Sequence, residues 1–208
     1  MPPVSAVQEQ LAKVLSPAFA KAAFRVDKSK PITFVCGGNN RNGVLALRHQ
    51  FLEKICGPPR RILPVLSEQA FPHQLHEGNL QRFEKFLAKT ADCVLIFVES
   101  PGSFAETGLF AAAPKIVEKT LIINTRKQSE KPSFLNLGPI KVIRKTSRFD
   151  AIFDLGRKAV TTADAESIIQ HILKIYPKTR YAHVFHPERK FRDLDLHFNL
   201  RVFTLQPL

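Results

Sequence analysis

The chain has 208 residues, of which 44% are hydrophobic, so it can form one domain-sized core with short appendages. Its formal net charge of +13 argues against a neutral or acidic surface and favours a polyanionic partner. No apolar run approaches the roughly 20 residues of a membrane-spanning helix. The amino terminus lacks the pattern of a secretion signal, and three cysteines do not suggest a disulfide framework. We therefore expect a cytoplasmic protein without membrane contact.

The two ends of the chain differ in pattern from its middle. Residues 5–23 follow an amphipathic helical pattern that Pro17 interrupts. We expect an N-terminal helical segment over residues 1–30, an α/β domain over 31–176 and a basic, aromatic C-terminal arm over 177–208. The Arg, Lys and aromatic residues of the arm suit contact with nucleic acid, and they suit packing on another subunit equally well.

The α/β pattern begins with a strand, a turn and a helix. The apolar run of residues 32–38 predicts a buried strand, and the spacing of apolar residues over 44–52 predicts a helix. Gly37 and Gly38 end this strand and Asn39 follows them, and the free amides of this turn could hold a base, a sugar or a phosphate. Asn and Gly are also common in ordinary turns. The turn lacks the dinucleotide-binding fingerprint and no Walker pattern is present, so we predict no cofactor.

A short second strand is expected over residues 60–66, where Pro64 favours an edge or an irregular position. The loop that follows carries His73 and His76, and loop histidines are usually solvated. A metal ion needs more ligands than this spacing supplies, so we predict no metal site.

The next helix, expected over residues 78–89, contains a carboxylate among its apolar positions. Glu84 lies four residues after Leu80 and three before Leu87, inside the stripe that should be buried. A carboxylate there is costly unless it is paired or opens onto a cavity. One interpretation is a salt bridge at the edge of the stripe. The other is a site carboxylate that faces Glu106, with a pKa raised by burial.

The most informative stretch is residues 92–108. An unbroken apolar run predicts a strand that is buried on both faces of a parallel sheet. Pro101 and Gly102 then turn the chain, and Ser103 is expected to open a helix. Glu99 and Glu106 therefore lie at the carboxyl end of a central strand. Ligands of open α/β sheets bind at that end.

The same residues allow a purely structural interpretation. Ser103 and Glu106 have the spacing of a capping box, in which the two side chains bind backbone amides at the start of a helix. The two roles are compatible, because the helix dipole stabilises an ionised carboxylate in the first turn and so suits a nucleophile or a base as well.

The remaining pattern continues the alternation of strands and helices. We expect strands over residues 119–124 and 140–144, and a helix over 165–176 with Asp164 as its cap. The fold class predicted is therefore α/β, a Rossmann-like (flavodoxin-like) parallel sheet flanked by helices.

Three pieces of the chain together resemble bacterial retron effector proteins whose core is similar to nucleoside 2-deoxyribosyltransferases. They are the Gly37–Gly38 loop, residues 97–108 and residues 133–140, and the resemblance covers about residues 31–176. It implies an antiphage toxin that is kept inactive in a complex with a reverse transcriptase and its multicopy single-stranded DNA. The basic charge agrees with such a partner.

The resemblance also implies site residues. Glu106 matches the nucleophile of the transferases, Glu99 the acid that precedes it, and Gly102 and Ser103 the turn between them. Glu84 stands where that family has a further carboxylate.

The sequence departs from the transferase pattern at three positions. Glu99 replaces an Asp, Thr107 replaces the usual Leu, and Pro101 is inserted between the two acids.

The predicted reaction is cleavage of an N-glycosidic bond in a nucleotide, in NAD or in nucleic acid. It requires a carboxylate at C1′ and an acid for the leaving base. We assign Glu106 as nucleophile and Glu84 or Glu99 as acid or orienter. Ser103 and its turn would hold a sugar hydroxyl or phosphate, and the loop after the first strand would contact the base or sugar.

Other functions are compatible with the sequence. One is a catalytically silent Rossmann-like module that senses a nucleotide or scaffolds a nucleoprotein, in which Glu106 is only a cap. A nuclease is less supported because no Asp/Glu/Lys metal cluster is evident. The resemblance makes a homo-oligomer plausible, since transferases of this type complete their sites with neighbouring subunits.

Overall fold

The computed structural model describes residues 30–40, 45–57, 60–70, 80–125, 130, 132–156 and 159–176. The predicted N-terminal helix, the loop histidines His73 and His76, and the C-terminal arm lie outside these residues. Within the part of the chain that is described, no helix combines the length and the apolar composition needed to cross a membrane.

Five parallel strands form one sheet in the order β2-β1-β3-β4-β5 within the described ranges. This order is that of flavodoxin-like folds, so the predicted α/β class with a Rossmann-like parallel sheet is confirmed. The specific likeness to nucleoside deoxyribosyltransferases stays a prediction. The strand bounds are Ile32–Cys36 (β1), Leu63–Val65 (β2), Cys93–Phe97 (β3), Thr120–Thr125 (β4) and Ile152–Leu155 (β5).

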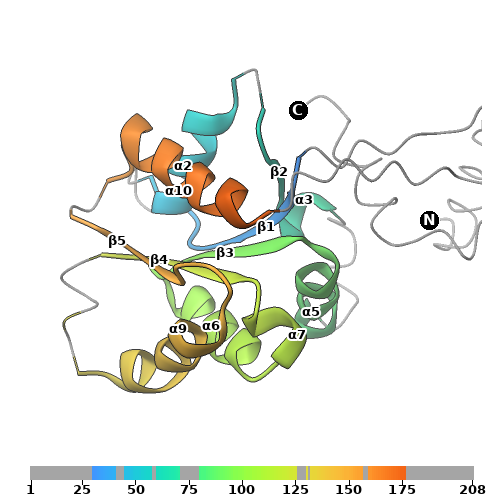
Figure 1. The fold of residues 1–208 in the computed structure, drawn as a ribbon, viewed down its shortest axis with the longest axis vertical. Helices are drawn as coiled ribbons and strands as arrows, with labels where there is room; N and C mark the ends of the chain where they lie inside the picture. Colours follow the sequence, from blue (N-terminus) through green and yellow to red (C-terminus); the bar gives the residue numbers. More distant parts are fainter. Residues whose placement is uncertain are drawn as a thin grey trace, which may run out of the picture. The chain divides into compact units, whose positions relative to one another are not determined.

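Helices cover both faces of this sheet, with α2 and α10 on one side and α5, α6, α7 and α9 on the other (Figure 1). Every residue of β1, β3 and β4 is buried, as expected for central strands covered on both faces. The helix bounds are Leu47–Ile55 (α2), Ser67–Ala70 (α3), Leu80–Thr90 (α5), Pro101–Ala111 (α6), Pro114–Val117 (α7), Lys141–Thr146 (α9) and Thr162–Ile175 (α10).

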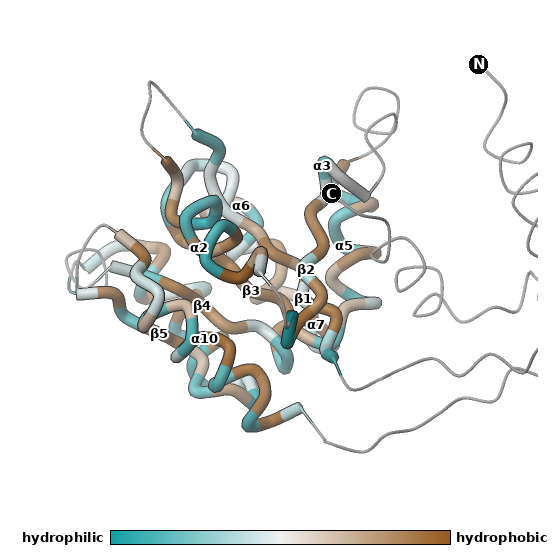
Figure 2. Tube along the Cα trace, turned by 90° about the horizontal axis from the view of Figure 1, so that it is seen from above, coloured by the Kyte–Doolittle hydropathy of each residue, from teal (hydrophilic) through white to brown (hydrophobic). Residues whose placement is uncertain are grey.

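Hydrophobic residues gather along β1, β2 and β3, whereas the helices alternate between hydrophilic and hydrophobic positions (Figure 2). The strand β2 lies at the edge of the sheet, which confirms the edge position expected from Pro64. The helix expected over residues 78–89 is α5, and Glu84 is buried in it with only 9% of its surface exposed.

The prediction of a final strand over residues 140–144 is wrong. Residues Asn136–Ile140 form a π-helical turn that leads into α9. Ile140 and Ile143, three residues apart, are buried, whereas Val142 is 44% exposed, so the spacing is that of a helix. The last strand of the sheet is β5, which the sequence analysis did not assign.

The start of α10 also differs from the prediction. Thr161 is the N-cap, and its hydroxyl accepts a hydrogen bond from the amide of Asp164 at 3.2 Å. The Asp164 carboxylate accepts in return from the Thr161 amide at 2.8 Å. The pair is a capping box, so Asp164 is its third helical residue and not the cap.

Alanine substitutions in α9 test the helical assignment. Ile143→Ala should lower the free energy of unfolding by about 2–4 kcal/mol, because it leaves a cavity under the sheet. Val142→Ala should change it by less than about 0.5 kcal/mol, because Val142 faces solvent. Urea denaturation measures both. Equal losses at the two positions would contradict the helix.

Candidate active site

A cavity of about 1110 Å³ lies at the carboxyl ends of β3 and β4. Residues of α5, α6 and the segment 133–139 line it, together with Val98 after β3 and Asn124 near the end of β4. Most of its lining is apolar, as is usual for ligand pockets. The polar side chains among its described lining residues are Gln81, Glu84, Glu106, Asn124, Ser133 and Asn136.

The start of α6 determines where Glu106 points. Ser100 is the N-cap: its hydroxyl accepts from the Ser103 amide at 3.2 Å, and the Ser103 hydroxyl accepts from the Ser100 amide at 3.0 Å. Pro101 occupies the first helical position, which it fits well. The predicted capping box of Ser103 and Glu106 is therefore wrong. Glu106 lies in the second helical turn and caps nothing at the start of α6.

The side of α6 that is buried carries Ser103, Thr107 and Phe110. The Thr107 hydroxyl donates to the Ser103 carbonyl at 2.6 Å, and Phe110 packs edge-on against Phe34 of β1 at 6.3 Å between ring centroids. The small residue Gly108 is not on this buried side of α6. Gly108 lines the cavity together with Glu106.

Glu84 from α5 and Glu106 from α6 meet in this cavity and interact directly. Burial raises the pKa of Glu106 to about 8, with the charge of Glu84 as the second cause. Burial also raises the pKa of Glu84, while hydrogen bonds from Ser67 and Glu106 act against that rise. The Oε2 atom of Glu106 is buried without a hydrogen-bond partner among the described groups. Two such neighbours cannot readily both ionise, so near neutral pH the pair holds one proton.

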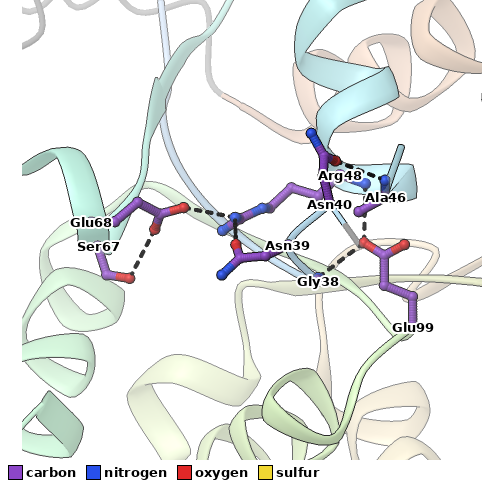
Figure 3. Close-up of polar contacts among 8 residues, drawn as sticks. All are labelled: Gly38, Asn39, Asn40, Ala46, Arg48, Ser67, Glu68 and Glu99. Atoms are coloured by element: carbon purple, nitrogen blue, oxygen red, sulfur yellow. Dashed lines mark hydrogen bonds and ion pairs between the residues drawn. The ribbon is translucent and has the colours of Figure 1, made fainter. Parts of the chain in front are cut away.

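Glu99 does not line the cavity, and its carboxylate points toward the start of α2 (Figure 3). Its carboxylate accepts hydrogen bonds from the amides of Gly38 at 3.0 Å, Leu47 at 2.6 Å and Arg48 at 3.1 Å. The N-cap residue Ala46 provides no side-chain cap. Glu99, two residues after β3, therefore supplies the acceptor that α2 lacks, at the end of the helix dipole that favours an anion.

The glycine loop is packed tightly against this carboxylate. A Cβ atom on Gly37 would lie 2.8 Å from the Arg48 Cβ and 3.1 Å from the Phe97 Cβ, and one on Gly38 would lie 3.2 Å from the Glu99 Cγ. Close packing with the protein itself therefore accounts for the glycine pair.

The predicted site residues thus separate into two groups. Ser103 is fully buried, where its hydroxyl accepts from the Glu99 amide at 3.1 Å and donates to the Ser100 carbonyl at 2.9 Å. For the predicted site residues that do not line the cavity, a role toward a substrate stays a prediction. The cavity is lined by Glu84, Glu106 and Gly102, whereas Glu99, Ser103, Gly37, Gly38 and Asn39 lie outside its lining.

The sequence analysis missed part of the cavity lining. Asn124 lies near the end of β4 with 1% of its surface exposed, and Phe134 presents an aromatic side chain that is 86% exposed. The position of Asn124, a polar residue near the end of an otherwise apolar strand, could have indicated a site residue. Nothing in the local pattern assigns Phe134 to a site, because a segment that leads into a strand at residue 140 is the structure predicted there.

The fold and the cavity define an α/β protein with a buried pair of carboxyl groups at the carboxyl edge of its sheet. The chain matches the family model of the STM3845 retron effector protein over residues 45–206, and it belongs to this family of retron effectors.

Two curated relatives come from Escherichia coli. The chain is 34% identical over 125 residues to "Retron Ec73 putative ribosyltransferase/DNA-binding protein", an alignment that covers 57% of this chain and 40% of that protein. It is 28% identical over 178 residues to "Retron Ec86 putative ribosyltransferase/DNA-binding protein", covering 82% of this chain and 56% of that protein. The chain thus spans about half the length of the curated relatives it matches.

Removal of the Glu99 carboxylate should destabilise the fold. Glu99→Ala leaves the amides of Gly38, Leu47 and Arg48 without their acceptor, so we expect a loss of about 2–4 kcal/mol in the free energy of unfolding. Glu53→Ala, an exposed site on the same helix α2, is the control and should change it by less than about 0.5 kcal/mol. Chemical denaturation compares the two. A loss at Glu99 no larger than at Glu53 would refute the structural role.

The raised pKa of Glu106 predicts how stability depends on pH. The folded protein retains a proton up to a pKa of about 8, whereas the ordinary value is 4.5, so the free energy of unfolding should fall as the pH rises between these values. Glu106→Gln removes this titration and should reduce the fall in the free energy of unfolding by about 3–5 kcal/mol. The variant should match the wild type at low pH and exceed it in stability at pH 8. Parallel curves for the two proteins would contradict a raised pKa.

Proposed function

We propose that this retron effector cleaves N-glycosidic bonds of nucleotides, NAD or nucleic acid, and that Glu106 is the nucleophile. The observation that carries the proposal is the buried Glu84–Glu106 pair in the cavity. Cleavage of a glycosidic bond passes through an oxocarbenium-like state and uses two carboxyl groups, of which one is ionised and the other protonated. A pair that shares one proton meets this requirement.

The proton must be on Glu84 when the reaction starts. Burial raises the pKa of both carboxyl groups, that of Glu106 to about 8, and the direct contact between Glu84 and Glu106 allows the shared proton to pass from one to the other. The Glu106 carboxylate then attacks C1′. The bond from C1′ to the base nitrogen breaks with its electrons going to the base, and the proton of Glu84 neutralises the base as it leaves.

The second half of the reaction restores the pair. Water, or the hydroxyl of another acceptor, attacks C1′ of the glycosyl ester on Glu106, and Glu84 takes the proton of that nucleophile. The ester bond breaks with its electrons returning to the Glu106 carboxylate. Water gives a free sugar, and another acceptor gives a transferred ribosyl group. The names of the E. coli relatives, which include ribosyltransferase, support chemistry at this carbon.

Other lining groups suit the substrate class. The face of Phe134 is available for stacking against a base. Asn124 and Asn136 provide amide groups that can hydrogen-bond the polar edge of a base or the sugar. Gly102 lines the cavity beside them and leaves room for close approach of a ligand.

The proposal extends to the biological setting. The effector would be a cytoplasmic antiphage toxin that is held inactive by a retron reverse transcriptase with its multicopy single-stranded DNA. Membership of the retron effector family and the net charge of +13 support such a nucleoprotein partner. We assign the α/β domain to residues 31–176, and the segments 1–30 and 177–208 are the proposed elements for contacts with partner subunits, including copies of the chain itself.

The proposed reaction is tested by release of free base. The wild-type protein is incubated with NAD, nucleotides and single-stranded DNA, alone and with the reverse transcriptase complex, and base is measured by chromatography. Glu106→Gln should reduce release to background, and Glu84→Gln should reduce it by about 10²–10⁴-fold.

The matched control is Glu118→Gln, an exposed site that is not among the residues lining the cavity, which should retain full release. The proposed function fails if Glu106→Gln releases base like the wild type. It fails equally if the folded wild type releases none in any of these mixtures.

A further inference from the structure

Arg48 is a buried cation beside the candidate site. It lies in the first turn of α2, and only 5% of its side chain is exposed. Its Nη2 atom forms an ion pair with Glu68 Oε1 at 2.6 Å and donates to Asn39 Oδ1 at 2.7 Å (Figure 3). Its Nε atom is buried with no partner among the described groups. A buried arginine whose Nε–H group has no hydrogen-bond acceptor contributes little to the free energy of unfolding. A role other than stability is therefore indicated.

Contacts continue from this ion pair to the two carboxyl groups. Ser67 and Glu68 form the start of α3, and the Ser67 hydroxyl donates to Glu68 Oε2 at 3.2 Å. The Ser67 hydroxyl also lies within hydrogen-bond reach of Glu84, so its one proton serves either Glu68 or Glu84. Glu84 in turn contacts Glu106. A continuous line of polar side chains therefore joins the loop after β1 to the carboxyl pair. Arg48 is the cation in that line.

We propose that Arg48 is a positioning residue, which together with Glu68 determines at which pH the Glu84–Glu106 pair holds a single proton. The consequence of this role of Arg48 for the reaction rate rests on the proposed function. The effect of Arg48 on the ionisation of Glu84 and Glu106 does not. Neither Arg48 nor Glu68 lines the cavity, so both act through the pair and not on a substrate directly.

The electrostatic surroundings of Glu106 give the two residues opposite effects. Apart from burial, the described groups that act on it are Glu84 on α5, Arg48 on α2 and Glu68 on α3. Burial, and after it the charge of Glu106, raise the pKa of the Cys36 thiol at the end of β1. After burial and Glu84, Arg48 lowers the pKa of Glu106 and Glu68 raises it. The two members of one ion pair thus shift the same proton in opposite directions. Loss of a merely structural ion pair would make no such distinction.

The test is a titration of the glutamate side-chain carboxyl carbons by ¹³C NMR, with the Glu106 signal assigned through Glu106→Gln. Arg48→Gln should move the upper titration step of the pair to higher pH, by about 0.5 pH unit or more. Glu68→Gln should move it to lower pH by a similar amount. Arg48→Lys, which retains the charge, should restore a value close to that of the wild type.

The control is Glu53→Gln on the exposed side of α2, which should leave the titration unchanged. If Arg48→Gln does not fold, Glu68→Gln and Arg48→Lys still decide, because the Glu68 side chain is 39% exposed and its replacement should be tolerated. The proposal is overturned if Glu68→Gln leaves the titration unchanged or moves it to higher pH, or if Arg48→Gln moves it the same way as Glu68→Gln. These titrations need no substrate, so they remain decisive even if no base release is found.

Discussion

The contact on which the site depends is that of the Glu99 carboxylate with the first amides of α2. It joins the end of β3 to the start of a helix that follows β1, across the point where the strand order reverses. In open α/β sheets this crevice and this helix end are where anionic ligands bind. Here a side chain of the protein itself fills the position. The cavity accordingly lies beside it, between α5, α6 and the segment that follows β4.

A fixed start of α2 has a second consequence, because it holds Arg48 at the edge of the sheet. From there its ion pair with Glu68 reaches α3 and, through Ser67, the buried carboxyl of Glu84. The Glu84–Glu106 pair is unfavourable in electrostatic terms: two acids are removed from water next to each other, and one of them must keep its proton. An arrangement that sacrifices stability in this way is typical of functional sites.

Much of the fold and both carboxylates of the Glu84–Glu106 pair could be predicted from sequence, largely because the signals were local. The apolar strands and a carboxylate at position 84 within an apolar helical stripe are examples. The failures occurred where local patterns are ambiguous. Ser100 and Ser103 both fit a cap, and Pro101 in the first helical position would have distinguished them. The short apolar run at Ile140 suits a strand or a helix, and only packing against the sheet decides. The role of Glu99 depends on contacts with residues 51 to 61 positions away, which no local pattern contains.

The central claim is that Glu106 is the nucleophile of a glycosyl-transfer reaction, and mass spectrometry of the intact Glu84→Gln protein tests it most directly. This variant lacks the base that would hydrolyse the intermediate, and a nucleoside with an activated leaving group needs no acid to react. We predict a mass increase equal to one sugar residue, mapped by peptide digestion to Glu106. Base release without an adduct, or an adduct on any other side chain, would contradict the account.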